Sequence, residues 1–324
     1  MLGDAGRVST ALSDLVTPRL RVVVDNDFSG DPDGLVQLAH HALSPSVVLV
    51  GVIGSHLRTG DAWDDTGASA QHAADAARRV LVLAGRSDVP VVAGSEVALA
   101  DGHSPRPSAG VDLILAEARR EDTDLPLYLA CGAGLTEVAS AWLTDAVAVE
   151  RTTLVWIGGA EHAGWAEPPP GAPEVEYNQA IDPLAVQLLF GDSAVPIWQV
   201  PRDAYRQTLA STAELVTRLA PHGELGRHLA DAVLAVGRRA AAGGRLLGET
   251  YALGDSPLVL LTALQSAFQP DPSSSRSVWL PTPRLDDRGR YVERPDGRPL
   301  RVWTQLDTRL MLEDLYAKLQ LAAG

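Results

Sequence analysis

Hydrophobic runs alternate with amphipathic stretches along the first two thirds of the chain. Continuous apolar runs, rich in Val, Ile and Leu, occur at 20–24, 47–53, 89–93, 125–130, 153–157 and 195–200. Apolar residues at helical spacing occur between them, at 34–43, 68–84, 111–119, 135–143 and 183–190. Strands that are apolar throughout are covered on both faces, and alternation with helices is typical of a parallel sheet. The pattern therefore predicts a Rossmann-like α/β fold with a mostly parallel sheet flanked by helices.

The C-terminal part of the chain is more helical. The spacing of apolar residues predicts helices over 211–241, 257–267 and 308–321. Residues 269–301 are rich in Pro, Ser, Arg and Asp. Within 291–303, the Asp296-Gly297 pair predicts the turn of a hairpin.

The sequence gives no sign of a division into domains. No linker and no internal repeat is visible, and 324 residues are enough to bury a substantial core. We therefore expect a single domain over 1–324, with an N-terminal extension at 1–18 and a hairpin or loop insertion at 270–303.

The composition is that of an ordinary globular protein, with 46% hydrophobic residues and a formal net charge of −14. This acidic balance argues against a nucleic-acid partner, because phosphate backbones are bound by clusters of Lys and Arg. Cys131 is the only cysteine, so no disulfide can form within the chain. No run approaches the roughly 18 apolar residues of a membrane span, and residues 1–18 do not resemble a signal peptide. We therefore expect a cytoplasmic protein that contacts neither nucleic acid nor membrane.

Four aspartates follow the first predicted strand: Asp25, Asp27, Asp31 and Asp33. Ligands of a parallel α/β sheet bind outside the carboxyl ends of its strands, which is where this cluster lies. Four carboxylates within nine residues repel one another, and a hard cation with oxygen ligands would compensate for their charge. One Asp is a common helix cap, but four are more than a cap needs. The cluster therefore indicates a metal-binding or catalytic role.

Two enzyme families place an Asp-x-Asp pair after a hydrophobic strand. Phosphatases of the haloacid dehalogenase type use a DxDx[TV] motif, which Asp25-Asn-Asp-Phe-Ser nearly fits. There the first Asp would be the nucleophile and the second a general acid. Such a site also needs a lysine between this motif and a late acidic motif, whereas Lys318, the only lysine, follows Gly254-Asp255. The phosphatase alternative is therefore disfavoured.

The second family is that of the inosine–uridine nucleoside hydrolases, which the chain resembles over most of its length. Its opening motif has a longer variant, DTDxGxDxDDA, and other segments read "LxxAGRxDVPVxxG", "ALGPLTNV", "MGGA", "EFN…DP" and "HDPL". Seven segments match in family order: VVVDNDFSGDPDGL at 22–35, VVLVGVI at 47–53, VLVLAGRSDVPVVAG at 80–94, ACGAGLTEV at 130–138, WIGGA at 156–160, EYNQAIDP at 176–183 and GDSPL at 254–258. Each match is weak alone, but their order is specific.

The resemblance implies a tightly held Ca²⁺ that grips two ribose hydroxyls and an attacking water. Carried over to this chain, the ligands would be Asp27, the backbone carbonyl of Thr136, and Asp255. Asp27 would also be the general base. An all-oxygen ligand set suits Ca²⁺ and suits Zn²⁺ poorly. The implied reaction is hydrolysis of the N-ribosyl bond of a nucleoside-like compound, and the family also implies a homo-oligomer.

The resemblance also implies residues that contact the substrate. Glu176 and Asn178 would grip the ribose and stabilise an oxocarbenium-like state as the base departs. Further substrate contacts are expected from the opening motif and from loops near the pocket, at Asp25, Asn26, His56 and Trp165. Trp165 is expected either to stack on a base or to pack as a lid.

Three departures from the family pattern bear on the chemistry. Gly34 stands where the family has the second Asp of its DD pair, a bidentate ligand, so Asp31 or Asp33 would have to replace it. Gly254 replaces the His that protonates the leaving base in some members, and Glu137 replaces the Asn of "LTN". A nucleoside- or sugar-binding protein without turnover therefore remains an alternative.

Overall fold

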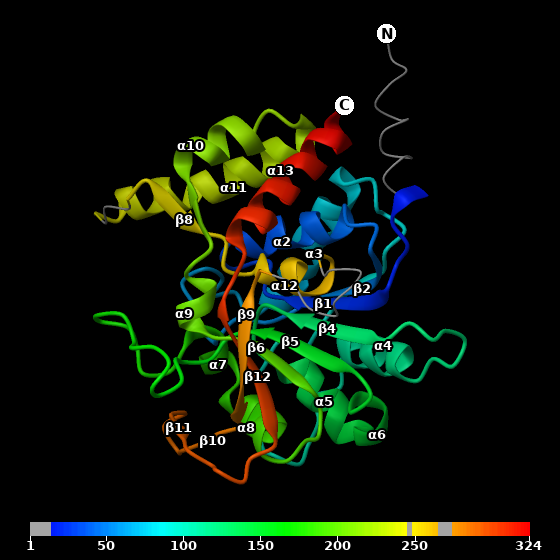
Figure 1. Ribbon diagram of the computed structural model, residues 1–324, viewed down its shortest axis with the longest axis vertical. Coiled ribbons are helices and arrows are strands. Elements are labelled where there is room, and N and C mark those ends of the chain that lie inside the picture. Colours follow the sequence, from blue (N-terminus) through cyan, green and yellow to red (C-terminus); the bar gives the residue numbers. More distant parts are fainter. Residues whose placement is uncertain (1–13, 245–247, 265–273) are drawn as a thin grey trace.

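The computed structural model describes residues 14–244, 248–264 and 274–324, and its centre is a sheet of eight strands (Figure 1). The strands lie in the order β3-β2-β1-β4-β5-β6-β12-β9, and every neighbouring pair is parallel except β12 and β9. Their bounds are Leu20–Asn26 (β1), Val47–Gly54 (β2), Val91–Ala93 (β3), Leu127–Cys131 (β4), Thr153–Ile157 (β5), Ile197–Val200 (β6), Arg276–Pro281 (β9) and Pro299–Gln305 (β12). The mostly parallel α/β sheet expected from the sequence is confirmed.

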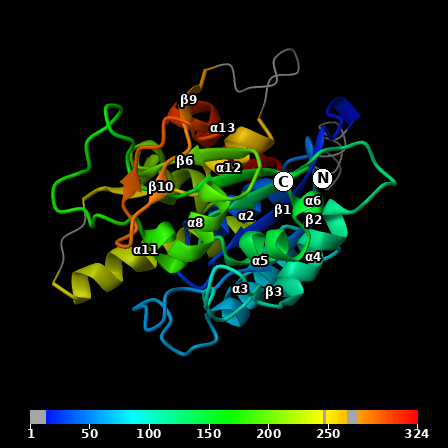
Figure 2. The ribbon, with the colours of Figure 1, turned by 90° about the horizontal axis from the view of Figure 1, so that it is seen from below.

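Helices cover both faces of this sheet, and each face buries its own hydrophobic cluster (Figures 1 and 2). One face is covered by α2 (Asp33–Ala42), α3 (Ser69–Leu83), α11 (Gly223–Ala242), α12 (Pro257–Thr262) and α13 (Thr308–Ala323). The other face is covered by α4 (Ala109–Ala118), α5 (Thr136–Thr144), α6 (Ala146–Val149) and α8 (Pro183–Gly191). Short elements connect these layers: α7 (Tyr177–Ile181), α9 (Arg202–Tyr205), α10 (Thr212–Glu214), the π-helix Leu215–Leu219, and the paired strands β7 (Leu209–Ser211) with β8 (Thr250–Ala252) and β10 (Arg284–Leu285) with β11 (Tyr291–Val292).

β1 carries the acidic motif and lies inside the sheet. All seven of its residues are buried, because β2 and β4 flank it and helices cover both of its faces. Val22 and Val24 belong to one hydrophobic cluster and Val23 to the other, as the alternation of side chains along a strand requires. The chain therefore leaves β1 at the carboxyl edge of the sheet and enters α2 through the acidic turn.

The strand pairing near the C-terminus differs from the hairpin predicted within 291–303. β11 pairs with β10, whereas β12 pairs antiparallel with β9 and parallel with β6. The N–H of Gly297 donates to the carbonyl of Arg294, so the Asp-Gly pair does lie in a turn, but not between paired strands. Residues of the expected 270–303 insertion thus form the edge of the central sheet. Burial explains this, since Leu300 and Trp303 of β12 are fully buried there.

Of the three helices predicted in the C-terminal part, the first is divided, the second is described only in part, and the third, α13, runs from Thr308 to Ala323 and so covers the predicted 308–321. The region 211–241 is divided between α10, the π-helix and α11, and Pro221, which has no N–H to donate, lies in the connection before α11. α12 covers the first part of the helix predicted over 257–267, and residues 265–267 lie outside the described residues. Most of the N-terminal extension, residues 1–13, lies outside them as well.

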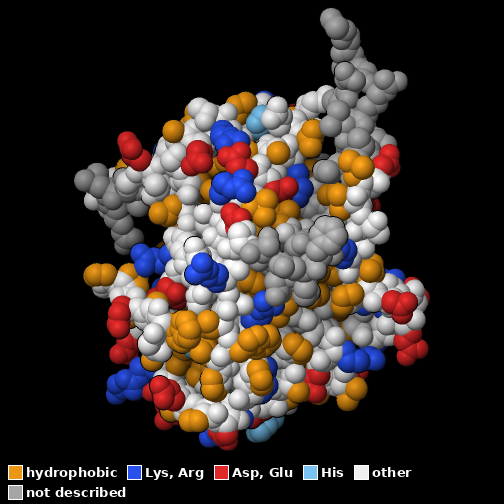
Figure 3. Space-filling model, viewed as in Figure 1, with side chains coloured by type: hydrophobic (Ala, Val, Ile, Leu, Met, Phe, Trp, Pro, Cys, Tyr) orange, Lys and Arg blue, Asp and Glu red, His pale blue; other side chains and the backbone are white. Residues whose placement is uncertain are grey.

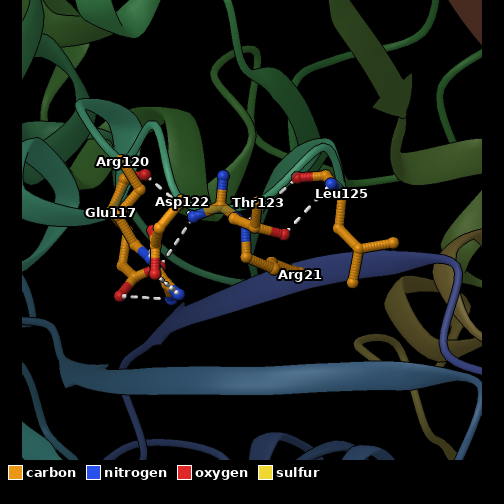
Figure 4. Close-up of polar contacts among 6 residues, drawn as sticks. All are labelled: Arg21, Glu117, Arg120, Asp122, Thr123 and Leu125. Atoms are coloured by element: carbon orange, nitrogen blue, oxygen red, sulfur yellow. Dashed lines mark hydrogen bonds and ion pairs between the residues drawn. The ribbon is translucent and has the colours of Figure 1, made fainter.

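An ion pair between Arg21 and Glu117 lies at the amino edge of the sheet, the edge opposite the acidic motif (Figure 4). Arg21 on β1 donates from Nη1 to Glu117 Oε2 at 2.7 Å and from Nε to the carbonyl of Leu125 at 3.0 Å. Arg21 is 6% exposed, whereas Arg120 pairs with Glu117 and Asp122 at the surface. The cluster therefore ties the end of α4 to the starts of β1 and β4.

Replacing Arg21 with Leu should lower the free energy of unfolding by about 3 kcal/mol, because Glu117 loses its buried partner. Replacing Arg120 with Ala is the matched control and should cost less than about 1 kcal/mol, since exposed ion pairs contribute little. Urea unfolding of both variants measures the difference. Equal losses would show that burial does not set the contribution of this ion pair.

Candidate active site

A cavity of about 210 Å³ opens at the carboxyl edge of the sheet. Parallel strands place their carboxyl ends at one edge, so loops that are distant in the sequence meet there. The residues that line the cavity are Asp27, Asp31, Asp33, Trp63, Gly132, Ile157, Glu176, Tyr177, Asn178, Tyr205, Gly254 and Asp255. The opening motif, the start of α7 and the loop before α12 thus converge on one hollow.

The aspartates of this cavity raise one another's pKa values. Burial raises the pKa of Asp27 well above its ordinary value, and repulsion from Asp255 and Asp31 raises it further. Burial and repulsion from Asp255 do the same for Asp33. Burial also raises the pKa of Asp255 to about 7. The cavity therefore either retains protons at neutral pH or binds a positive charge.

The donor set of the cavity fits a hard divalent cation. Carboxylate oxygens are the ligands that Ca²⁺ prefers, and no Lys or Arg is among the lining residues. In the part of the chain that the structure describes, no three His, Cys, Asp or Glu side chains already lie close enough together to enclose an ion. Binding would therefore draw these carboxylates toward the cation, and the positive charge of the cation would offset their mutual repulsion.

The space beside Gly34 is occupied by the side chain of Asn26. Asn26 Nδ2 donates to Asp255 Oδ2 at 2.9 Å, and a Cβ atom on Gly34 would lie 2.9 Å from that same Nδ2. Asp33 is held from the other side, since its Oδ2 accepts from the N–H of Asp255 at 3.0 Å. The position that carries an aspartate in the family pattern is thus filled by a neutral amide.

The space beside Gly254 is limited by Tyr205 and Asp33. A Cβ atom on Gly254 would lie 3.1 Å from Asp33 Oδ2 and 3.4 Å from Tyr205 Cδ2. Tyr205 lines the cavity, and its hydroxyl donates to Glu176 Oε1 at 2.9 Å. The phenol ring therefore lies between Gly254 and Glu176.

Glu176 and Asn178 are fixed by backbone groups around the start of α7. Glu176 Oε2 accepts from the N–H groups of Gly159 at 2.8 Å and Gln179 at 3.1 Å. Asn178 Nδ2 donates to the carbonyls of Gly132 and Ile157, both at 2.9 Å. Both side chains line the cavity, so the structure brings them together with Asp27 and Asp255.

Three other predicted site residues are buried next to the cavity but do not line it. Asp25 accepts from the hydroxyl of Ser55, and burial raises its pKa to about 7. His56 Nε2 lies 3.0 Å from Thr136 Oγ1, and its Nδ1 lies 2.9 Å from the carbonyl of Leu57. The Thr136 hydroxyl in turn donates to Asp182 at 2.7 Å. Their side chains are therefore engaged with neighbouring protein groups.

Trp165 lies in a different hollow. It is 52% exposed and lines an apolar groove with His162, Tyr291 and prolines of the β9–β11 region. Trp63 is the tryptophan that lines the acidic cavity, and the guanidinium of Arg239 lies 4.8 Å from the centre of its ring. Trp165 therefore does not line the acidic cavity.

Trp63, Tyr177 and Tyr205 line the cavity but were not predicted as site residues. Tyr177 lies between the two predicted residues Glu176 and Asn178, which is a usable signal, and its hydroxyl donates to Asp61 at 3.0 Å. Trp63 and Tyr205 lie in no motif. Their places depend on how the loops before α3 and after β6 fold over the sheet.

The fold is shared with nucleoside hydrolases of known structure. A plant nucleoside hydrolase is similar with a TM-score of 0.69 and 18% identity, over 94% of this chain and 99% of that one. A purine-preferring ribonucleoside hydrolase from Gardnerella vaginalis gives 0.68 and 18%, over 94% and 99% of the two chains. An inosine-uridine preferring nucleoside hydrolase from Bacillus anthracis gives 0.63 and 17%, over 93% and 99%.

Three further findings concern curated proteins, membrane-spanning helices and the family model. None of the curated proteins matches the chain. Among residues 14–244, 248–264 and 274–324, no helix is both long and apolar enough to span a membrane. The family model described as inosine-uridine preferring nucleoside hydrolase matches residues 22–307, which is most of the chain. The chain therefore belongs to this family and is an N-glycosyl hydrolase.

Proposed function

We propose that this enzyme hydrolyses the N-ribosyl bond of a nucleoside-like compound, releasing ribose and a base, with the help of Ca²⁺ or a similar divalent cation. The observation that carries this proposal is the acidic cavity, where Asp27, Asp33 and Asp255 face one another without a basic side chain. Asp31, exposed at the rim, and the backbone carbonyl of Thr136, whose side chain is turned to His56 and Asp182, would complete the proposed ligand set. A bound cation would supply the positive charge that holds the sugar hydroxyls and makes water more acidic.

Asp27 is the proposed general base. It lies at the carboxyl end of β1, is 7% exposed and has a raised pKa, so it is a stronger base than an exposed aspartate. Its carboxylate would take the proton from the attacking water. Asp33 is less suited to this role, because both of its oxygens accept hydrogen bonds from the backbone N–H groups of Gly34 and Asp255.

Glu176 and Asn178 are proposed to hold the ribose. Both amide hydrogens of Asn178 are used by backbone carbonyls, so its Oδ1 remains to accept a hydrogen bond from a sugar hydroxyl. Glu176 is oriented by two backbone N–H groups and by Tyr205 before any substrate arrives. Such preorganised groups need little rearrangement as charge develops on the sugar.

The leaving base is proposed to pack against Trp63 and Tyr177, two aromatic side chains that line the cavity. Gly254 offers no proton donor, and burial raises the pKa of Tyr205 well above its ordinary value, so the phenol stays protonated. Its proton is already shared with Glu176. We therefore propose a substrate whose base departs without a strong general acid.

The phosphatase alternative has no support at this site. Lys318 is on α13, where its Nζ pairs with Asp314 at 2.5 Å and donates to Ser44 at 2.9 Å. It does not line the acidic cavity. The alternative raised by the glycines at positions 34 and 254, a binding protein without turnover, would show ligand-induced thermal stabilisation without ribose release.

The remaining proposals concern the setting of the enzyme. One domain over 1–324 is supported by the two hydrophobic clusters that share the central sheet. A homo-oligomer is supported by hydrophobic side chains that gather over β9 and β12 in the lower half of Figure 3, where Trp279 is 63% exposed. A cytoplasmic location and the lack of a nucleic-acid partner are supported by the single cysteine and the net charge of −14.

Replacing Asp27 with Asn should reduce ribose release from nucleosides by about 10³-fold, because the amide cannot accept the proton of water. Replacing the exposed Asp231 with Asn is the matched control and should leave the rate unchanged. Circular dichroism shows whether both variants fold. A folded Asp27→Asn enzyme with full turnover would remove Asp27 as the base.

Stabilisation by Ca²⁺ should depend on pH. Because the carboxyl pKa values are raised, the metal-free native state holds protons that the unfolded chain releases. These carboxyl groups therefore destabilise the fold increasingly as pH rises from about 4 to about 7. Ca²⁺ needs the deprotonated carboxylates and reverses this effect. The rise in Tm on adding Ca²⁺ should therefore be larger near pH 8 than near pH 5.5. A Ca²⁺ effect that does not vary with pH would contradict binding at this cluster.

A further inference from the structure

A row of buried polar side chains leads from the acidic cavity into the hydrophobic layer between the sheet and α12. Its members are Asn26 on β1, Gln37 and His41 on α2, and Thr262 on α12, each at most 2% exposed. Around them, this face of the sheet is filled by apolar residues, among them Val24, Leu38 and Leu258. Polar groups in such a place are costly unless all of their hydrogen bonds are made.

The four side chains form one continuous hydrogen-bonded relay. Asn26 Nδ2 lies 3.4 Å from Gln37 Oε1, at the long end of a hydrogen bond, and donates to Asp255 Oδ2 at 2.9 Å. Gln37 Nε2 donates to His41 Nδ1 one helical turn further along α2. His41 Nε2 lies 2.8 Å from Thr262 Oγ1. The relay therefore joins Thr262, the last residue of α12, to Asp255, which precedes the amino end of the same helix.

Backbone groups fix the direction of every hydrogen bond in this relay. The N–H of Asp27 donates to Asn26 Oδ1 at 2.9 Å, so the Asn26 amide can only turn its NH₂ group toward Asp255 and Gln37. At the other end, the Thr262 hydroxyl donates to the carbonyl of Leu258 at 2.6 Å and must accept from His41. His41 is thus the neutral tautomer with its proton on Nε2, consistent with burial, which lowers its pKa to about 3.

The relay holds Asn26 in a space that two glycines leave open. A Cβ atom would lie 2.9 Å from Asn26 Nδ2 if it were on Gly34, and 2.4 Å if it were on Gly132. Asn26 cannot turn away from these positions without breaking its bonds to Asp27 and Gln37. A side chain at position 34 and the observed Asn26 conformation therefore exclude each other.

We propose that Gln37 and His41 are positioning residues that hold the Asn26 amide in the space beside Gly34. The Asn26 amide in turn donates a hydrogen bond to Asp255 Oδ2, so that Oδ1 of Asp255 is left to bind the cation. The cation part of this inference rests on the proposed function. The conformation of Asn26 does not, and it can be measured separately.

The direct test replaces Gln37 with Met, which keeps the length of the side chain but removes both of its hydrogen bonds. Replacing His40 with Met is the matched control, because His40 is on the same helix, equally buried, and pairs with Asp314 on α13 instead. Calorimetry should show Ca²⁺ binding about tenfold weaker in Gln37→Met, as for other groups that orient a ligand, and within twofold of wild type in His40→Met. The effect should appear in KM more than in kcat.

Two results would overturn the inference: equal losses of Ca²⁺ affinity in the two variants, or no loss in Gln37→Met. Nitrogen NMR of histidine-labelled protein adds a readout without metal. His41 should show a protonated Nε2 and a hydrogen-bonded Nδ1 in wild type, and the Nδ1 signal should shift in Gln37→Met. A wild-type protein that binds no Ca²⁺ would remove the proposed metal site, whereas a His41 signal unchanged in Gln37→Met would remove the relay.

A second experiment tests the mutual exclusion of Asn26 and a side chain at position 34. Gly34→Asp alone adds a carboxylate but should not raise Ca²⁺ affinity, because Asn26 occupies its space. Combined with Asn26→Thr, the same change should raise Ca²⁺ affinity at least about tenfold above that of Asn26→Thr alone, a non-additive effect expected of residues in contact. An equal gain with and without Asn26→Thr would show that the two positions do not compete.

Discussion

Repulsion among buried carboxyl groups at the carboxyl edge of the sheet is the constraint on which the rest of this site depends. Asp27, Asp33 and Asp255 come from two segments more than two hundred residues apart, and the fold presses them together where water is largely excluded. Their charge has no basic partner in the cavity, so protons or a cation must balance it. The surrounding groups hold these carboxylates in place, and protons or a cation neutralise their charge.

The two glycines that depart from the family pattern are explained by their neighbours. At position 34 the Asn26 amide fills the space and donates a hydrogen bond to Asp255. At position 254 the ring of Tyr205 lies close by and its hydroxyl reaches Glu176. In both places a side chain of the family pattern has been exchanged for a glycine plus a polar group from another element. The cavity is acidic, and no histidine is among its lining residues.

The sequence by itself determined the layers of the fold and the centre of the site. Strands buried on both faces must be apolar throughout, so the valine-rich runs of β1 and β2 were recognisable without any structure. The acidic motif follows β1 directly, and connections from parallel strands must leave at the carboxyl edge. Asp27, Glu176, Asn178 and Asp255 were expected together from the family resemblance of their motifs, and they line one cavity.

Only the tertiary structure decided which neighbours complete the site. The His56 ring bonds to the Thr136 hydroxyl instead of facing the cavity, and Trp63, not Trp165, lines the cavity. The partner of β12 was likewise set by distant residues, since β9 and β6 together bury its apolar side chains. Such choices depend on contacts between segments far apart in the sequence and on the direction of single side chains. Local periodicity determines that a residue is on a strand or a loop, but it carries no information about which of several nearby hollows its side chain enters.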